Sequence, residues 1–156
     1  MFLYSRSSQY ALRALSYLVK NPESPVLTET IADQEDIPKS FLSKIMQDLV
    51  RAKILSSARG RKGGFKLIRD PKATTIYEVI DVFDDLESMM KVCAIGWEKC
   101  SDDNPCDLHH KYKALREQVK KYFQEVNLAE FAEVTVDKEK REKSVVFSRN
   151  QNLPPA

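Results

Sequence analysis

Three of the four glycines in this chain of 156 residues lie within one short segment, residues 59–64, whose sequence is RGRKGG. Glycine adopts positive φ values without strain and lets the backbone come close to another group, as a tight hairpin tip requires. The runs on either side, 54–58 and 65–68, are expected to form two strands. The segment therefore predicts a small β-hairpin with a basic tip.

Three helices are predicted before this hairpin. Apolar residues recur at intervals of three and four over 8–18, which places them on one helix face. A short helix is expected over 28–34, and a turn over 35–38 separates it from a third helix that Ser40 caps and that covers 41–50. Two short helices around a tight turn, followed by a basic hairpin, are typical of a winged helix-turn-helix.

The segment 39–69 is strongly basic. Nine Lys and Arg residues and the single acid Asp48 give it a net charge of +8, although the net charge of the whole chain is only +2. Such a segment predicts a polyanionic partner, most often nucleic acid. A solvated basic face on an ordinary small domain is the alternative, but the order of the helices and the composition of the hairpin favour double-stranded DNA.

The predicted DNA contacts lie on the outer face of the third helix and on the hairpin. Lys44 and Gln47 suit base edges, a lysine for guanine and a glutamine for adenine. Lys39, Ser40 and Arg51 suit phosphates, and the basic hairpin tip suits a narrow minor groove. The remaining candidates are Thr28, Phe41, Ser43, Arg59, Gly60, Arg61, Lys62, Gly63 and Gly64.

A helix over 76–83 is expected after the hairpin, capped by Thr74 or Thr75. Residues 84–106 then lose periodicity and gather Asp, Asn, Gly and Pro, so a loop is predicted there. This loop contains the three cysteines of the chain: Cys93, Cys100 and Cys106.

An odd number of cysteines in so short a window does not suit a disulfide framework. Three thiolates in a loop, with His109 at the start of the next helix as a further donor, suit a metal. Gaps of six and five residues are wider than the two-residue spacing of most zinc sites and favour a bulkier iron-sulfur cluster. A zinc site and a metal-free thiol switch are the alternatives.

The most regular helical pattern follows, with apolar residues at spacings of 4, 3, 4, 3 and 4. These residues are Leu108, Tyr112, Leu115, Val119, Tyr122 and Val126. Such a stripe resembles a coiled-coil seam, and a second copy of the chain is its simplest partner. A homodimer is therefore predicted, with Phe123 in its core. Asn127 is expected to cap a last short helix, and residues 136–156 to form a mobile tail.

Other classes of protein fit the sequence poorly. No apolar run approaches the roughly 18 residues that span a bilayer, and the N-terminus has no signal-peptide layout, so a cytoplasmic protein without a membrane partner is expected. No nucleophile is accompanied by a base and an orienting group, so an enzyme is not expected. The predicted fold is mainly α with a small β-wing, divided into a DNA-binding domain (1–83), a cysteine loop (84–106), a dimerisation segment with its long helix (107–135) and the tail.

Four segments resemble the Rrf2 family of bacterial winged helix-turn-helix regulators: YALRAL at 10–15, IPKSFL at 37–42, LSSARG at 55–60 and GGFKL at 63–67. The resemblance extends over about residues 1–136. It implies a homodimer in which the long helix, here about 107–126, crosses that of the partner, with the cysteine loop between this helix and the DNA-binding domain. The recognition helix differs from the family pattern at residues 43–44, so base preference is not transferred.

The resemblance also implies a ligand set. Cys93, Cys100 and Cys106 match cysteine ligands of the family and His109 matches a histidine ligand, a pattern that favours a 2Fe-2S cluster, with 4Fe-4S as the alternative. It implies a transcriptional regulator, expected to be a repressor, whose operator affinity depends on the cluster. The signal would then be cluster or iron supply, redox state or nitric oxide.

Overall fold

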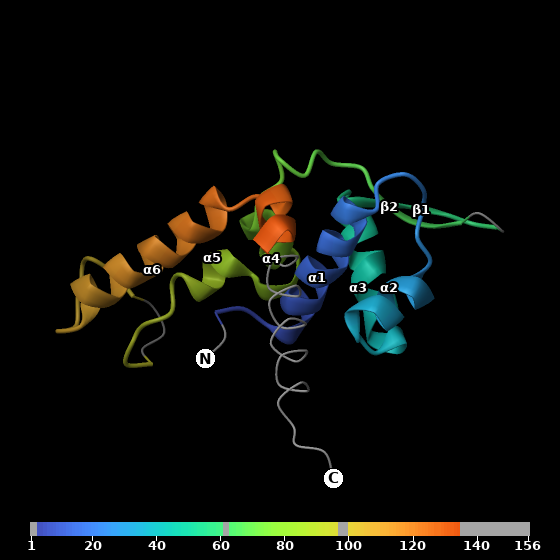
Figure 1. The fold of residues 1–156 in the computed structure, drawn as a ribbon. Coiled ribbons are helices and arrows are strands. Elements are labelled where there is room, and N and C mark those ends of the chain that lie inside the picture. The colour runs from blue at the N-terminus through green and yellow to red at the C-terminus, as the bar shows by residue number, and fades with distance from the viewer. Residues whose placement is uncertain (1–2, 61–62, 97–99, 135–156) are drawn as a thin grey trace, which may run out of the picture.

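The computed structural model describes residues 3–60, 63–96 and 100–134, and it is mainly helical (Figure 1). The elements are α1 (Arg6–Lys20), α2 (Thr28–Glu35), α3 (Lys39–Arg51), β1 (Leu55–Ala58), β2 (Gly64–Leu67), α4 (Ile76–Asp84), α5 (Leu86–Met89) and α6 (His109–Glu125). A further helical segment covers 128–134. The expected fold class is confirmed, whereas the predicted tail lies outside the described residues. Among the described helices, none is long and apolar enough to cross a membrane.

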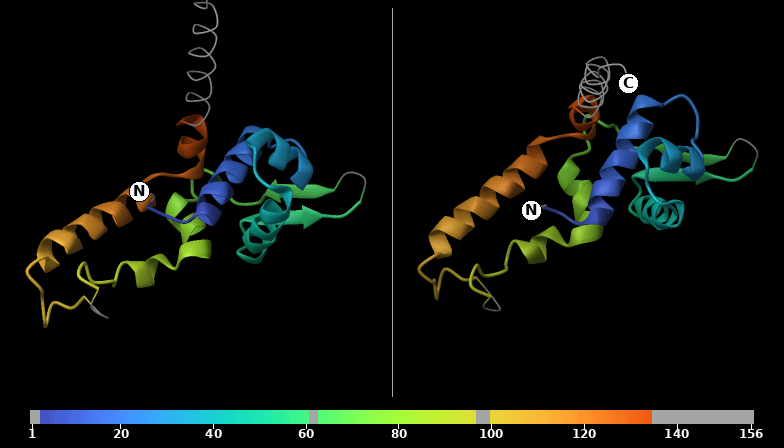
Figure 2. Two further views of the ribbon diagram at one scale, coloured as in Figure 1. Left: turned by 90° about the horizontal axis from the view of Figure 1, so that it is seen from below. Right: turned by 60° about the horizontal axis from the view of Figure 1, so that its bottom comes forward.

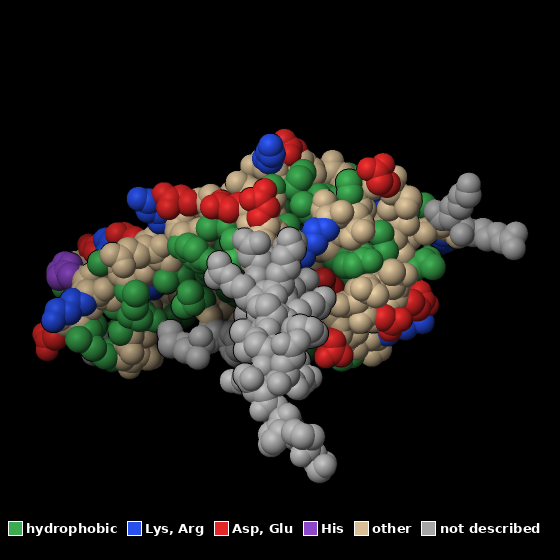
Figure 3. Space-filling model, in the orientation of Figure 1, with side chains coloured by type: hydrophobic (Ala, Val, Ile, Leu, Met, Phe, Trp, Pro, Cys, Tyr) green, Lys and Arg blue, Asp and Glu red, His purple; other side chains and the backbone are tan. Residues whose placement is uncertain are grey.

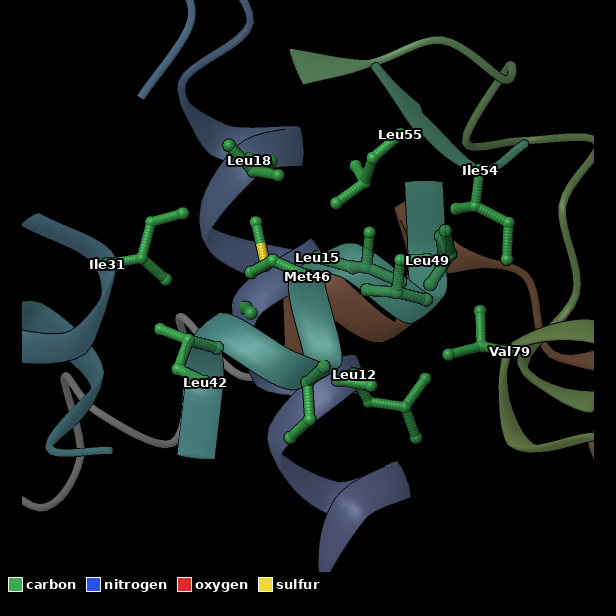
Figure 4. Close-up of a cluster of buried hydrophobic side chains, with 14 of the residues drawn as sticks. Leu12, Leu15, Leu18, Ile31, Leu42, Met46, Leu49, Ile54, Leu55 and Val79 are labelled. Atoms are coloured by element: carbon green, nitrogen blue, oxygen red, sulfur yellow. The ribbon is translucent and has the colours of Figure 1, made fainter. Parts of the chain in front are cut away.

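Helix α1 forms the centre of the core. Leu12 and Leu15 are fully buried, and the small residues Ala11 and Ala14 let neighbouring helices come close. Burial of each such leucine contributes about 1.5–3 kcal/mol to the free energy of folding. The side chains that meet α1 are Ile31 of α2, Leu42, Met46 and Leu49 of α3, Ile54, Leu55 of β1 and Val79 of α4 (Figure 4).

The turn between α2 and α3 differs in one detail from the prediction. Asp36 adopts the left-handed conformation (φ 48°), and Ile37, which is buried, donates its N–H to the carbonyl of Ala32 at 2.9 Å. This pattern ends α2 as a Schellman-type turn. Pro38, not Ser40, occupies the position before α3, so the predicted Ser40 cap is wrong. Proline already has the φ that a helix start requires, and Ser40 lies inside the helix.

The hairpin is present, in a register that sets Ala58 opposite Gly64. On the far side of β2, Val26 exchanges two backbone hydrogen bonds with Phe65, at 2.9 and 2.8 Å. Gly64 has φ +137°, and a Cβ there would lie 2.5 Å from the carbonyl oxygen of Val26. Gly63 is likewise crowded by the backbone of Ala58. Both glycines therefore make room for the chain's own backbone.

Thr75 caps α4 through a capping box. Its hydroxyl accepts from the N–H of Glu78 at 3.3 Å, and the Glu78 carboxylate accepts from the N–H of Thr75 at 3.0 Å. Thr74 is instead buried, and its carbonyl accepts from the N–H of Leu128 at 2.9 Å. The start of α4 is thus joined to the chain that follows α6, where Asn127 caps the last helix by accepting from the N–H of Glu130 at 3.0 Å.

Residues 84–106 are not a loop throughout, contrary to the prediction. The short helix α5 begins after Asp85, whose carboxylate accepts from the N–H of Ser88 at 3.2 Å, and Leu86 is fully buried. Four residues make only about one helical turn, so α5 leaves no periodic signal in the sequence.

Helix α6 leans away from the core and reaches it only near its C-terminal end (Figure 2). Phe123 is fully buried there and stacks edge-on against Tyr4, with ring centroids 5.8 Å apart. The assignment of Phe123 to a dimer core is therefore wrong. Phe123 directly follows Tyr122 of the apolar stripe, and it belongs to the same buried cluster as Val79 and Ile80 of α4.

Replacement of Gly64 by alanine is expected to destabilise the fold strongly. Positive φ costs a non-glycine residue about 1–3 kcal/mol, and the clash with Val26 adds about 1–3 kcal/mol more. Gly60→Ala is the matched control, because Gly60 also has positive φ (+100°) but has no atom within 4 Å of a new Cβ. Urea unfolding measures both free energies. Equal losses in the two variants would show that the approach of Val26 is unimportant.

Candidate DNA interface and cysteine site

The outer face of α3 carries the two predicted base-reading residues. Lys44 and Gln47 are both exposed, one helical turn apart on the side opposite the buried Leu42 and Met46. Neither side chain is drawn into the core, because the apolar residues of α3 occupy the opposite positions of the helical repeat. The two side chains are therefore available to a partner.

Three of the predicted DNA contacts, Lys39, Arg51 and Ser43, already have partners within the chain. Lys39 lies 2.5 Å from the carboxylate of Glu29, and this hydrogen bond lowers the pKa of Glu29 below its usual value. Arg51 pairs with Asp48 on the preceding turn of α3, and the hydroxyl of Ser43 donates to the carbonyl of Lys39 at 2.9 Å. The side chains of Lys39 and Arg51 remain 60% and 75% exposed, so a phosphate can replace these weak surface partners.

Ser40 and Phe41 are exposed at the start of α3, and Thr28 is half-buried at the start of α2. Phe41 is 41% exposed and touches Tyr10 edge-on, with ring centroids 5.7 Å apart. On the hairpin, Arg59 and Gly60 are exposed. Arg61 and Lys62 lie outside the described residues, and Gly63 is buried and Gly64 half-buried.

Two of the four predicted metal-site residues are brought together. The thiol sulfur of Cys100 lies 3.1 Å from Nδ1 of His109, and His109 is only 2% exposed. Cys106 lies nearby in sequence, and its carbonyl accepts from the N–H of His109 at 2.9 Å. Cys93 lies earlier in the chain and is buried. Among the described residues, neither a disulfide nor a compact group of three metal-binding side chains is formed.

The other ring nitrogen of His109 is held by a residue that sequence reasoning missed. Nε2 lies 2.7 Å from the carboxylate of Asp102, and Lys113 donates to both oxygens of that carboxylate, at 2.9 and 2.7 Å. Hydrogen bonds from Lys113 and His109 lower the pKa of Asp102 to about 2. Asp102 is therefore anionic at neutral pH and accepts a hydrogen bond from the Nε2–H of His109, which leaves the Nδ1 lone pair facing Cys100.

Residues on one face of α6 contact the preceding segment at two points, Asp102 and Val92. His109, Lys113 and Arg116 follow each other at spacings of four and three, and Arg116 donates to the carbonyl of Val92 at 2.6 Å. This helical spacing is the signal in the sequence that could have identified Lys113 and Arg116. Asp102 carries no such signal, because it lies in irregular chain. An open hollow beside the segment is lined by Ser88, Lys91, Val92, Cys100, Ser101, Asp102 and Asp103.

The apolar stripe of α6 is largely uncovered. Leu108, Leu115 and Tyr122 are 48%, 51% and 51% exposed. Hydrophobic side chains also gather on the surface around α5 and α6 (Figure 3), and the exposed residues include Met89 at the end of α5 and Val92 after it. An apolar face of this extent is typical of a surface that a partner covers.

Several known proteins similar to this chain are HTH-type transcriptional regulators. A protein of Aquifex aeolicus assigned as an HTH-type transcriptional regulator is 37% identical over 123 residues, which cover 78% of this chain and 85% of the relative. The HTH-type transcriptional regulator IscR of Yersinia pseudotuberculosis is 28% identical over 78% of this chain and 74% of its own length. These relatives are transcriptional regulators and not enzymes, which confirms the expectation from the sequence that this chain is not an enzyme.

Solved structures of low sequence identity share the fold. CymR, the global cysteine regulator of B. subtilis, has a TM-score of 0.72 at 23% identity and covers 86% of this chain and 98% of its own. IscR of T. potens has a TM-score of 0.68 at 18% identity, over 86% of this chain and 88% of its own. The Rrf2 family model, described as an iron-dependent transcriptional regulator, matches residues 4–134. The chain is thus a DNA-binding transcriptional regulator, and it belongs to the Rrf2 family.

Proposed function

We propose that this regulator binds its operator as a homodimer and that an iron-sulfur cluster held by residues 93–109 controls its affinity, as a repressor. The observation that carries the proposal is the contact between Cys100 and Nδ1 of His109. The functional division follows the sequence: a DNA-binding domain over 1–83, a cluster segment over 84–106 and a dimerisation segment over 107–135. The hairpin and α3 then supply the DNA surface.

The DNA-binding surface divides into two roles. Lys44 and Gln47 enter the major groove from the outer face of α3, where their side chains reach base edges. Lys39, Arg51 and the tip of the hairpin contact the phosphates or the minor groove and set the position of the helix on the duplex. The ion pairs of Lys39 and Arg51 exchange a carboxylate for a phosphate when DNA binds.

Substitutions in these two groups are expected to differ in kind. Arg59→Ala should weaken binding to every duplex and reduce the slope of log K against log salt concentration by about 1. Gln47→Ala should mainly relax base preference, by about 1–3 kcal/mol on a duplex that the wild-type protein enriches from a random library. Fluorescence anisotropy at several salt concentrations measures both.

Lys111→Ala is the control for charge, because Lys111 is exposed near the end of α6 that lies farthest from the hairpin (Figure 1). It should leave affinity and slope unchanged. If Lys111→Ala and Arg59→Ala reduce binding equally, the assignment of the hairpin as a DNA-contacting wing is wrong.

The homodimer rests on the uncovered stripe of α6. Leu115→Asp places a charge on this stripe and is expected to give a monomer, because the charge would be buried at the interface. Gln124→Asp adds the same charge on the opposite face of α6 and should leave a dimer. Sedimentation equilibrium gives the mass of each variant, and circular dichroism checks that both remain helical. A Leu115→Asp dimer would place the interface elsewhere.

The residues of the cysteine segment fit an iron-sulfur cluster in their chemistry. Thiolate sulfurs and an imidazole nitrogen are ligands that iron-sulfur clusters accept. The hollow beside Cys100 leaves room next to the Cys100 sulfur and Nδ1 of His109. Cys93, Cys100, Cys106 and His109 would hold the cluster, which supplies a redox-active and chemically labile group. A 2Fe-2S cluster matches this donor set, with 4Fe-4S as the alternative.

Contacts within the chain link this segment to the DNA surface. Arg116 and Lys113 hold the segment to α6, and the chain after α6 is hydrogen-bonded to the start of α4 through Leu128 and Thr74. Helix α4 packs on α1, against which α3 lies. A cluster that contacts this segment differently in two conformations of the protein favours one of them over the other. Because the chain of contacts ends at α3, the favoured conformation sets the position of α3 and thereby the affinity for DNA.

Native mass spectrometry of protein reconstituted without oxygen tests the cluster. The wild type should be a dimer that carries two irons and two sulfides per chain, and Cys100→Ala should lose them while the neighbouring Ser101→Ala keeps them. Filled and cluster-free protein should then differ by about 5-fold or more in operator affinity at fixed salt.

Other masses decide between the alternatives. Four irons per chain would indicate the larger cluster. Zinc, or no added mass after reconstitution, would favour a winged-helix regulator with a zinc site or a thiol switch. Equal affinities of the filled and cluster-free forms on several enriched duplexes would contradict control by the cluster but not DNA binding.

A further inference from the structure

We propose that Asp102 and Lys113 are positioning residues that orient His109, so that its Nδ1 is the nitrogen offered to the cluster. This inference rests on the proposed function, since it names which atom of His109 serves as ligand and which residues present it. Neither residue would touch the cluster, because both act on the opposite side of the imidazole ring.

The geometry around His109 determines the tautomer. Of its two ring nitrogens, Nε2 lies 2.7 Å from a carboxylate oxygen of Asp102. An ionised carboxylate carries no proton, so it can accept a hydrogen bond but cannot donate one. The proton of a neutral imidazole therefore belongs on Nε2. Nδ1, 3.1 Å from the sulfur of Cys100, keeps its lone pair. Metal-binding histidines are commonly held in this way, with the second ring nitrogen donating to a carboxylate.

The placement of Asp102 is itself fixed. Its side chain is 66% exposed, and an exposed carboxylate that met only one lysine would be an ordinary surface ion pair of little consequence. Here Lys113, one turn after His109 on α6, donates to both carboxylate oxygens, and one of those oxygens also accepts from the ring. Lys113 thus holds the carboxylate against a histidine side chain that is only 3% exposed.

A matched control lies one position along the chain. Asp103 is also exposed and also carries a carboxylate, but its carboxylate accepts from the hydroxyl of Ser101 at 3.4 Å, and its N–H donates to that hydroxyl at 3.1 Å. Asp103→Ala removes the same charge from the same segment without touching the ring. The difference between Asp102→Ala and Asp103→Ala isolates the hydrogen bond to His109 from the general effect of negative charge.

Two measurements on full-length protein with ¹⁵N-labelled histidine test the role. In the cluster-free protein at pH 8, nuclear magnetic resonance reports the tautomer of His109, expected as Nε2–H in the wild type and in Asp103→Ala. In the reconstituted protein, the nitrogen coupling of the reduced cluster reports histidine ligation. Asp102→Ala should lose the tautomer preference and release iron to a chelator about 10-fold faster or more, the scale found when such partners are removed.

Conservative variants separate positioning from folding. Asp102→Asn keeps an acceptor oxygen and should restore most of the histidine coupling, whereas Lys113→Met, which frees the carboxylate, should release iron faster than the wild type. An unchanged tautomer in Asp102→Ala, or iron release no faster than from Asp103→Ala, would overturn the positioning role alone. A wild-type chain that binds no cluster after reconstitution contradicts the proposed function instead, and the tautomer of His109 is then the measurement that decides whether Asp102 orients the ring.

Discussion

The burial of α1 is the constraint on which the rest of the structure depends. Helices α2, α3 and α4 and strand β2 all pack on it, and they can do so because its core-facing residues alternate between leucine and small side chains such as Ala11 and Ala14. A larger residue at either alanine would overpack the core and force the neighbouring elements to shift. The orientation of α3, and so of the exposed Lys44 and Gln47, therefore follows from how closely α1 admits its neighbours.

Much of the fold could be predicted because burial leaves a periodic trace in the sequence. The helices over 6–20, 39–51 and 109–125 follow from apolar spacings of three and four, and the hairpin follows from its glycines. What escaped prediction depends on contacts between distant segments. The clash that requires glycine at 64 involves Val26, and the burial of Phe123 involves Tyr4. No local pattern records either contact.

The candidate site divides in the same way. Residue type and spacing are enough to select Cys100 and His109, which the structure places in contact. Lys113 lies one helical turn after His109, so helical spacing also indicates its position. Asp102 could not have been chosen over Asp103, because two adjacent aspartates in irregular chain differ only in where the backbone directs them. Their different partners arise from the path of the chain between Cys100 and α6.

Helix α6 is fixed to the core at Phe123, whereas His109 lies fourteen residues away, beyond the core. At 1.5 Å per residue this is an arm of about 21 Å, so a tilt of about 5° at the buried end displaces the other end by about 2 Å. The same relation holds in the other direction. A displacement of about 2 Å at His109 corresponds to a much smaller displacement of the buried end of α6 beside α4. The length of α6 thus determines how strongly a small tilt at the packed end changes the position of His109 at the other end.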